Sequence, residues 1–329
     1  MSASRSVHAQ AVLGLLLANL FWGLSFPLIK AIILAHGLIL PGGGHWFVTA
    51  MTVAPRFLLA TVLLGLLVRR DLASLTRGEI RQGLLLGLSA ALGMYLQNDG
   101  LHFTAASTSA FLTQFYAIMI PGWVALRSRR APGAVVWAAG ALVLAGVAVL
   151  GRFDFHTLRL GRGEVETLLS SLFFMWQIFL LSDRTSAANR MLLVTVVMFA
   201  TEAAGFTLLA LATAAHPADF LVPWTGGPWL AFTLLLTVFC TLGSFTLMNR
   251  WQPKISATEA GLIYCLEPVC TAVMALFLPG WFSRWAGFAY ANETVTWRLL
   301  AGGGLVTLAN VLIQLKPPAK TAGTARDGA

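Results

Sequence analysis

The sequence predicts an all-α membrane protein with ten transmembrane helices, arranged as two inverted five-helix repeats with both termini in the cytoplasm. Its 329 residues are 57% hydrophobic and 11% charged, whereas about a quarter of the residues in soluble domains are charged. Ten apolar runs of about twenty residues fit a hydrocarbon core about 30 Å thick. In addition, one apolar run of the first half aligns without a gap with a run of the second half.

The connections between the apolar runs are short, so we expect no soluble domain. The predicted spans, in order, are residues 10–34, 46–68, 80–99, 106–126, 133–151, 163–182, 191–214, 228–249, 256–279 and 297–315. We expect the first repeat at residues 1–155 and the second at residues 156–316. Residues 317–329 are rich in Pro, Gly and Ala and predict a disordered cytoplasmic tail.

The distribution of basic residues predicts the orientation of the chain. With the N-terminus in the cytoplasm, fifteen Lys and Arg residues fall in cytoplasmic loops and tails, and five fall in outer loops. This asymmetry follows the positive-inside rule. The net charge of +9 therefore reflects membrane topology, and we expect a lipid bilayer and not nucleic acid as a partner. The oligomeric state stays open.

The ninth span carries the least expected pair of residues, Glu267 followed by Pro268. Proline has no N–H for the carbonyl of Tyr264, so the helix must kink there. A carboxylate at the centre of a bilayer costs about 2.5–3.5 kcal/mol on insertion scales. We therefore expect this face of the ninth span to turn toward the protein interior.

The fourth span has a proline at the position that corresponds to Pro268. Residues 108–126 align with residues 255–273, which places Pro121 over Pro268. Because each half has five spans, an odd number, the second copy enters the membrane from the opposite side. Such inverted repeats are typical of transporters, whose substrates bind near the midplane between the repeats.

The first and sixth spans give a second, weaker match between the halves. Trp22 precedes Lys30 by the same eight residues that separate Trp176 from Arg184. Each of these two spans thus has a tryptophan at mid-depth and a basic residue near its end. A second match in corresponding positions strengthens the prediction of a duplication.

Charged residues inside spans cost free energy unless they are paired with an opposite charge or in contact with water. Arg56 in the second span and Glu202 in the seventh lie near the middle of their runs, and Glu267 lies in the ninth. These three residues are candidates for ion coupling or for a structural ion pair, and the sequence leaves both open. It also leaves open whether Arg56 meets Glu202, Glu267 or neither. Polar residues 97–99 are interpreted as the membrane exit of the third span and not as a gate.

Signatures of enzymes and metal sites are scarce. The six histidines fall in predicted loops or in the N-terminal tail, without the spacing of metal ligands. Cys240, Cys265 and Cys270 all fall in apolar spans, which disfavours a disulfide. We therefore expect no catalytic residues, no metal site and no cofactor.

Polar and aromatic groups at mid-depth form the candidate substrate site. Aromatic walls with a few hydrogen-bonding groups are typical of small-molecule sites, although such side chains also serve as packing. The candidates are Trp22, Gln114, Pro121, Trp176, Gln177, Asn249, Tyr264, Glu267 and Pro268.

The ordered motifs of the chain resemble those of EamA-type members of the drug/metabolite transporter superfamily. They are Trp22-Gly23, Arg56-Phe57, the stretch 100–112 that leads to Pro121, and the Leu-Glu-Pro-Val stretch 266–269. The resemblance covers nearly the whole chain, but each motif is short. It implies an inverted five-plus-five repeat, alternating access, and export of amino acids or other small metabolites, commonly from the bacterial inner membrane.

One segment departs from that family. After Gly280 the family usually has glutamate, whereas this chain has Trp281 and a predicted outer loop up to residue 296. The role of that loop stays open. The resemblance further implies a cavity lined mainly by the first, third, fourth, sixth, eighth and ninth helices.

The leading hypothesis is a secondary transporter of a small organic solute, in which Glu267 carries a proton. A carboxylate held away from water can take up a proton near physiological pH. The alternatives are a membrane enzyme or carrier for a lipid-linked or sugar substrate, and a channel. A carrier of sugar phosphates would need several cations at mid-span, and only Arg56 is plainly available.

Overall fold

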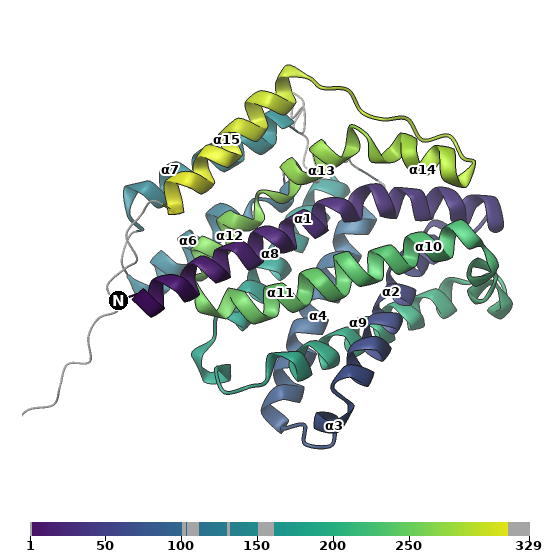
Figure 1. The fold of residues 1–329 in the computed structure, drawn as a ribbon, viewed down its shortest axis with the longest axis horizontal. Coiled ribbons are helices and arrows are strands. Elements are labelled where there is room, and N and C mark those ends of the chain that lie inside the picture. Colours follow the sequence, from purple (N-terminus) through teal and green to yellow (C-terminus); the bar gives the residue numbers. More distant parts are fainter. Residues whose placement is uncertain (1, 101–102, 104–111, 130–131, 151–160, 315–329) are drawn as a thin grey trace, which may run out of the picture.

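The computed structural model describes residues 2–100, 103, 112–129, 132–150 and 161–314. The chain is 84% helical, and the described residues contain no strand. The long helix α1 crosses the molecule, with α13 and α14 along one side and α10 and α11 along the other (Figure 1). Helices α7 and α15 pack side by side at one edge.

In its described residues, the first half of the chain forms the long helices α1 and α2, the short helix α3 and three further helices. Pro27, Pro55 and Pro121 lie inside α1, α2 and α6. The helices are α1 (Ser2–Ile39), α2 (His45–Leu67), α3 (Arg69–Leu72), α4 (Arg77–Gly100), α6 (Tyr116–Ser128) and α7 (Ala134–Leu150).

The second half is more broken than the first. Its segments are α8 (Arg162–Leu181), η1 (Arg184–Ser186), α9 (Met191–Thr213), η2 (Pro217–Phe220), η3 (Val222–Thr225), α10 (Gly227–Leu235), the π-helical η4 (Leu236–Gly243), α11 (Ser244–Trp251), η5 (Gln252–Lys254), α12 (Ala257–Tyr264), α13 (Glu267–Ala275), α14 (Leu278–Ala286) and α15 (Trp297–Gln314).

The helices confirm an all-α membrane protein with five or six membrane-length helices. Within the described residues, five helices are long and apolar enough to cross a membrane, namely Ser6–Ile39, His45–Leu67, Arg162–Leu181, Met191–Thr213 and Gly227–Lys254. The bent pair Ala257–Ala275 and Leu278–Ala286, with 53° between its parts, would be a sixth. Ten spans and an inverted repeat stay predictions.

Some sequence predictions fall outside the described residues. These are the start of the fourth span, most of the 100–112 motif, the boundary between residues 155 and 156, and the tail 317–329. Two others are corrected. The predicted outer loop begins with a helix, because α14 extends to Ala286. His36, expected in a loop, is 1% exposed in the last turn of α1, where it packs edge-on against Phe47.

Glycines let α4 lie unusually close to α9. A Cβ added at Gly83 would lie 2.8 Å from the carbonyl oxygen of Val194, and one at Gly87 would lie 2.7 Å from that of Met198. Small residues permit such close approach between membrane helices. Together with its contacts to α8, this packing ties α4 of the first half firmly to the second half.

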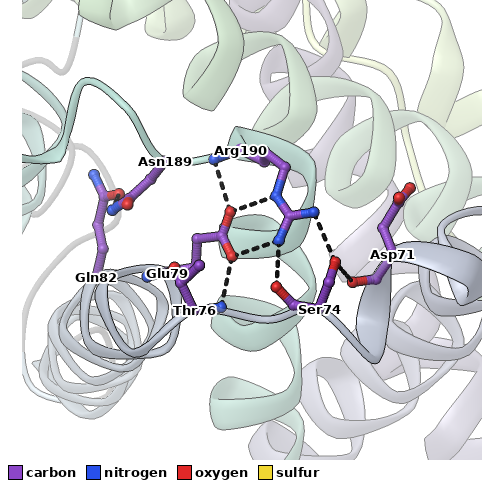
Figure 2. A network of polar contacts seen from close by, with 7 residues as sticks. All are labelled: Asp71, Ser74, Thr76, Glu79, Gln82, Asn189 and Arg190. Atoms are coloured by element: carbon purple, nitrogen blue, oxygen red, sulfur yellow. Dashed lines mark hydrogen bonds and ion pairs between the residues drawn. The ribbon is translucent and has the colours of Figure 1, made fainter.

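An ion pair holds each end of α4 to the second half. At its start, the Glu79 carboxylate accepts bonds from the Arg190 backbone N–H (3.1 Å), Nε (2.7 Å) and Nη2 (2.9 Å) (Figure 2). Glu79 also closes a capping box with Thr76, which begins the helix. At its other end, Asp99 is paired with Arg162. Asp99 is therefore engaged in an ion pair that joins α4 to α8.

The pair between Glu79 and Arg190 predicts how stability depends on pH. The Arg190 guanidinium, aided by Thr76, lowers the pKa of Glu79 from 4.5 to about 2. The stability that the ionised Glu79 gives to the fold is therefore fully present above pH 4.5 and is lost as the pH falls from 4.5 to about 2. We expect Glu79→Gln to lower the free energy of unfolding by about 1–3 kcal/mol at pH 7, and by progressively less below pH 4.5.

Thermal unfolding in detergent at pH 7, 4 and 3 checks this prediction. Glu293→Gln, in an exposed segment, is the control and should change the stability little at any pH. An equal loss for Glu79→Gln at pH 7 and pH 3 would show that the ion pair does not supply the stability.

Candidate functional site

The site is built around a two-residue interruption between α12 and α13, where Cys265 and Leu266 keep right-handed helical backbone angles. The N–H groups of Cys265 and Leu266 bond the carbonyls of Leu262 and Ile263, three residues back, at 3.2 and 3.1 Å. Pro268 is then the second residue of α13, a position where the missing N–H costs nothing. A tight turn of the helix thus lies just before Pro268, whereas the 53° bend of this segment lies further along the chain, between Ala275 and Leu278.

Glu267 is the first residue of α13, where the helix dipole favours a negative charge. Its side chain is half-buried, and within the described residues its carboxylate has no hydrogen bond and no ion pair. The carboxylate interacts electrostatically with Cys240 of η4 and with Tyr116 of α6. An unengaged carboxylate thus lies among α6, α13 and η4.

Five aromatic rings form a continuous chain beside the break. The ring centroid of Trp22 lies 5.4 Å from that of Tyr264 and 5.5 Å from that of Phe245. Phe245 in turn lies 5.9 Å from Phe57 and 6.0 Å from Phe199, and these two are 5.6 Å apart. Edge-on and tilted pairs at these distances are favourable. The chain links helices α1, α2, α9, α11 and α12 in one wall.

Gln252 joins the aromatic chain to α8 through hydrogen bonds. It is fully buried, accepts a bond from the Tyr264 hydroxyl at 2.8 Å, and donates one to the carbonyl of Ile178 at 2.7 Å. Gln252 was not predicted from the sequence, because a glutamine beside Pro253 looks like an ordinary loop residue. Its role depends on α8, which is distant in the sequence.

The fourth span differs from its prediction. The chain is irregular at Gln114 and Phe115, where the N–H groups of Ala117 and Ile118 bond three residues back at 2.9 and 3.0 Å. Pro121 lies inside the continuous helix α6. The kink expected at Pro121 stays a prediction, and the irregular turn lies before α6. Gln114 is buried, and among the described residues its Oε1 has no hydrogen-bond partner.

The remaining candidates are dispersed. Asn249 is fully buried and donates to the Thr195 hydroxyl of α9 at 2.8 Å. Gln177 is buried, and its Nε2 has no hydrogen-bond partner within the described ranges. Trp176 is 49% exposed, and among the described rings it stacks on none. The structure therefore gathers Trp22, Tyr264, Glu267 and Pro268 at the break and does not stack Trp176 with them.

Arg56 and Glu202 are neighbours inside the α2–α9 pair. They interact electrostatically, although no described contact joins them within 4.0 Å. Arg56 donates to the Met94 sulfur at 3.5 Å and lies 5.0 Å from the Phe57 ring centroid. Glu202 is fully buried, and among the described residues neither of its carboxylate oxygens has a hydrogen-bond partner. Arg56 and Glu267 both act electrostatically on Cys240, so the two charged sites share one interior.

A row of hydroxyls also faces this interior and was missed from the sequence. Thr233, Thr237, Thr241 and Ser244 are at most 1% exposed, and the hydroxyls of Thr233 and Thr241 have no hydrogen-bond partner in the part of the chain that the structure describes. The row runs through the π-helical η4, and π-helical turns often mark functional sites. Among the described residues no group of three His, Cys, Asp or Glu could hold a metal.

Gly23 brings α1 against the start of α13. A Cβ at this position would lie 2.5 Å from Cys270 Cβ and 3.0 Å from the backbone of Cys270 and Thr271. We expect Gly23→Ala to force the helices apart and to cost about 1–3 kcal/mol. Gly37→Ala on the same helix meets nothing within 4 Å and should be neutral or stabilising. Thermal unfolding compares the two variants, and equal stabilities would contradict the tight crossing.

No protein-family model matches the chain. An uncharacterized transporter of Archaeoglobus fulgidus is 23% identical over 313 residues, which cover 93% of this chain and 86% of that protein. A solved crystal structure of a protein superposes with a TM-score of 0.66 at 16% identity and covers 94% of this chain and 97% of that one. The chain thus shares its fold with a solved protein and is similar over nearly its whole length to a transporter.

Proposed function

We propose that this chain is a secondary transporter that exports amino acids or similar small metabolites by alternating access, without a cofactor. The observation that carries the proposal is the unengaged Glu267 carboxylate, which lies at a broken helix beside a wall of five aromatic rings. Broken helices at a substrate site are typical of transporters. The similarity to the curated transporter over 93% of the chain supports the same function.

The packing suggests which parts would move. Helices α2, α4, α8 and α9 pack closely, and ion pairs fix both ends of α4, so this group would act as a rigid support. The half-helices α12 and α13 meet at Cys265 and Leu266 with only local bonds. Rotation about this break would expose Glu267 to one side of the membrane and then to the other.

The charges favour neutral or zwitterionic solutes. Glu267 and Arg56 bear opposite charges in one interior, and Arg56 is the only buried arginine or lysine among the described residues. Phosphate groups generally need several cations. The aromatic wall would contact the apolar part of the solute. The membrane would be a bacterial cytoplasmic membrane, with two EamA-like repeats at residues 1–155 and 156–316.

Proteoliposomes that contain the purified full-length chain test this proposal. We expect saturable movement of at least one labelled amino acid, at a rate that changes when a proton gradient is imposed. Protein-free vesicles are the control. Saturable movement indifferent to the gradient would indicate a facilitator. The absence of movement for amino acids, sugars and small aromatic metabolites alike would contradict transport.

A further inference from the structure

A second candidate site lies at the end of the bundle that the charge distribution assigns to the cytoplasm. A cavity of about 350 Å³ opens between the end of α2, α3, the start of α9 and the end of α11. Its polar lining consists of Asp71, Arg190, Thr195, Thr246 and Arg250. Its other walls are apolar, so it combines a few charged groups with apolar surface, as small-molecule sites do.

Arg190 is already engaged and does not serve a ligand. Its guanidinium donates to both oxygens of Glu79, to the Ser74 hydroxyl at 2.9 Å and to the Ser74 carbonyl at 2.7 Å (Figure 2). Asn189 and Gln82 extend the network with a bond of 2.8 Å. Arg190 therefore forms a fixed wall of the cavity.

Two residues of opposite charge in the lining, Asp71 and Arg250, form no ion pair among the described residues. The Asp71 carboxylate points away from the Arg190 guanidinium (Figure 2) and makes no hydrogen bond or ion pair within the described residues. Arg250 lies over the Trp251 ring at 5.2 Å from its centroid. Among the described residues Arg250 has no acidic partner. Both side chains are exposed, so each can meet a ligand from solution.

We infer that this cavity binds a zwitterion, with its anionic end on Arg250 and its cationic end on Asp71. Apolar residues such as Val68 and Leu192 line the same space and would hold an apolar side chain. The inference rests on the proposed transport of small zwitterions, for which this cavity would be a first binding site on the cytoplasmic side.

The cavity connects with the interior site through α11. Thr195, which is 1% exposed, lines the cavity, and its hydroxyl accepts the bond from Asn249. Asn249 lies one helical turn after Phe245, which belongs to the aromatic chain. Thr246 and Arg250 occupy the neighbouring face of the same helix and line the cavity. A zwitterion in the cavity would therefore lie next to the wall that leads to Trp22.

Two sources would supply the same chemistry. A free amino acid presents a carboxylate and an ammonium group, and an ethanolamine phosphate headgroup presents a phosphate and an ammonium group. Both would use Arg250 for the anion and Asp71 for the cation. The two ligands can be distinguished, because the lipid headgroup would occupy the cavity without added amino acid.

Protection of a local cysteine provides the test and does not depend on transport. Thr246→Cys places a thiol in the lining of the cavity, and its alkylation by a water-soluble maleimide is followed by mass spectrometry of the labelled peptide. Leucine is the probe. We expect leucine to slow this alkylation and to leave alkylation unchanged in Lys254→Cys, an exposed position outside the lining.

The charged residues are then changed in the Thr246→Cys background. Asp71→Asn and Arg250→Gln should each raise the leucine concentration for half protection about tenfold, the value for one charge-assisted hydrogen bond. Leucinamide, which lacks the carboxylate, should be insensitive to Arg250→Gln. In the same way 4-methylpentanoate, which lacks the ammonium group, should be insensitive to Asp71→Asn.

The outcomes separate this inference from the proposed function. Protection by leucine that both substitutions weaken supports a free amino acid as the ligand. Protection only in phosphatidylethanolamine nanodiscs, absent in phosphatidylcholine and lost in both variants, assigns the site to the headgroup. The inference is overturned if neither leucine nor the headgroup slows the alkylation, or if neither substitution changes the protection. A chain that shows protection but moves no solute would refute only the proposed transport.

Discussion

Glu267→Gln is expected to abolish the accumulation of solute that a proton gradient drives. A one-unit pH gradient can hold about a tenfold concentration ratio of a neutral solute when one proton exchanges for one solute. Glutamine keeps the size of the side chain but carries no exchangeable proton, so the ratio should fall from about ten to about one. The steady-state ratio of a labelled amino acid across proteoliposome membranes measures this change.

Glu259→Gln provides the matched control on the same broken segment. Glu259 lies in the first turn of α12, where it accepts a bond from His8 at 2.9 Å. Its substitution should leave the accumulation ratio unchanged. Downhill exchange should survive in Glu267→Gln, which separates loss of coupling from loss of folding. A tenfold ratio that persists in Glu267→Gln would exclude this residue as the proton carrier.

Removal of Glu202 is expected to destabilise the fold more than removal of Arg56. A guanidinium cannot lose its proton in a protein, so Glu202→Gln leaves the buried Arg56 cation without its acidic neighbour, which should cost more than the ~1–3 kcal/mol of an unsatisfied buried polar group. A carboxylate, by contrast, can be neutralised by a proton. Arg56→Met should therefore cost only about 1–3 kcal/mol, the scale of an unsatisfied buried polar group.

The double variant Arg56→Met with Glu202→Gln completes this comparison. It removes both charges and should recover most of the stability that Glu202→Gln loses, because no buried cation is then left without an acidic neighbour. Chemical or thermal unfolding in one detergent compares the four proteins. A smaller loss for Glu202→Gln than for Arg56→Met would show that Glu202 is already neutral in the native protein.

Some features follow from local chemistry, and these were predictable. The excess of apolar residues determines a helical membrane protein, because every backbone group in a bilayer must be bonded within the chain. The break near Pro268 was predictable because a missing N–H acts on its own turn. The capping box of Thr76 and Glu79 is also local and could have been predicted from the sequence. Ten spans and an inverted repeat stay predictions.

The partners of the polar side chains were decided by the tertiary structure alone. The sequence left open whether Arg56 meets Glu202, Glu267 or neither, and the packing of α2 on α9 brings Glu202 near it without a described contact within 4.0 Å. Glu79 and Arg190 are 111 residues apart. Likewise Asp71 of α3 and Arg250 of α11 line one cavity only because of how the helices pack. In helices that are apolar on every side, periodicity does not show which face turns inward, so only helix packing determines which side chains meet.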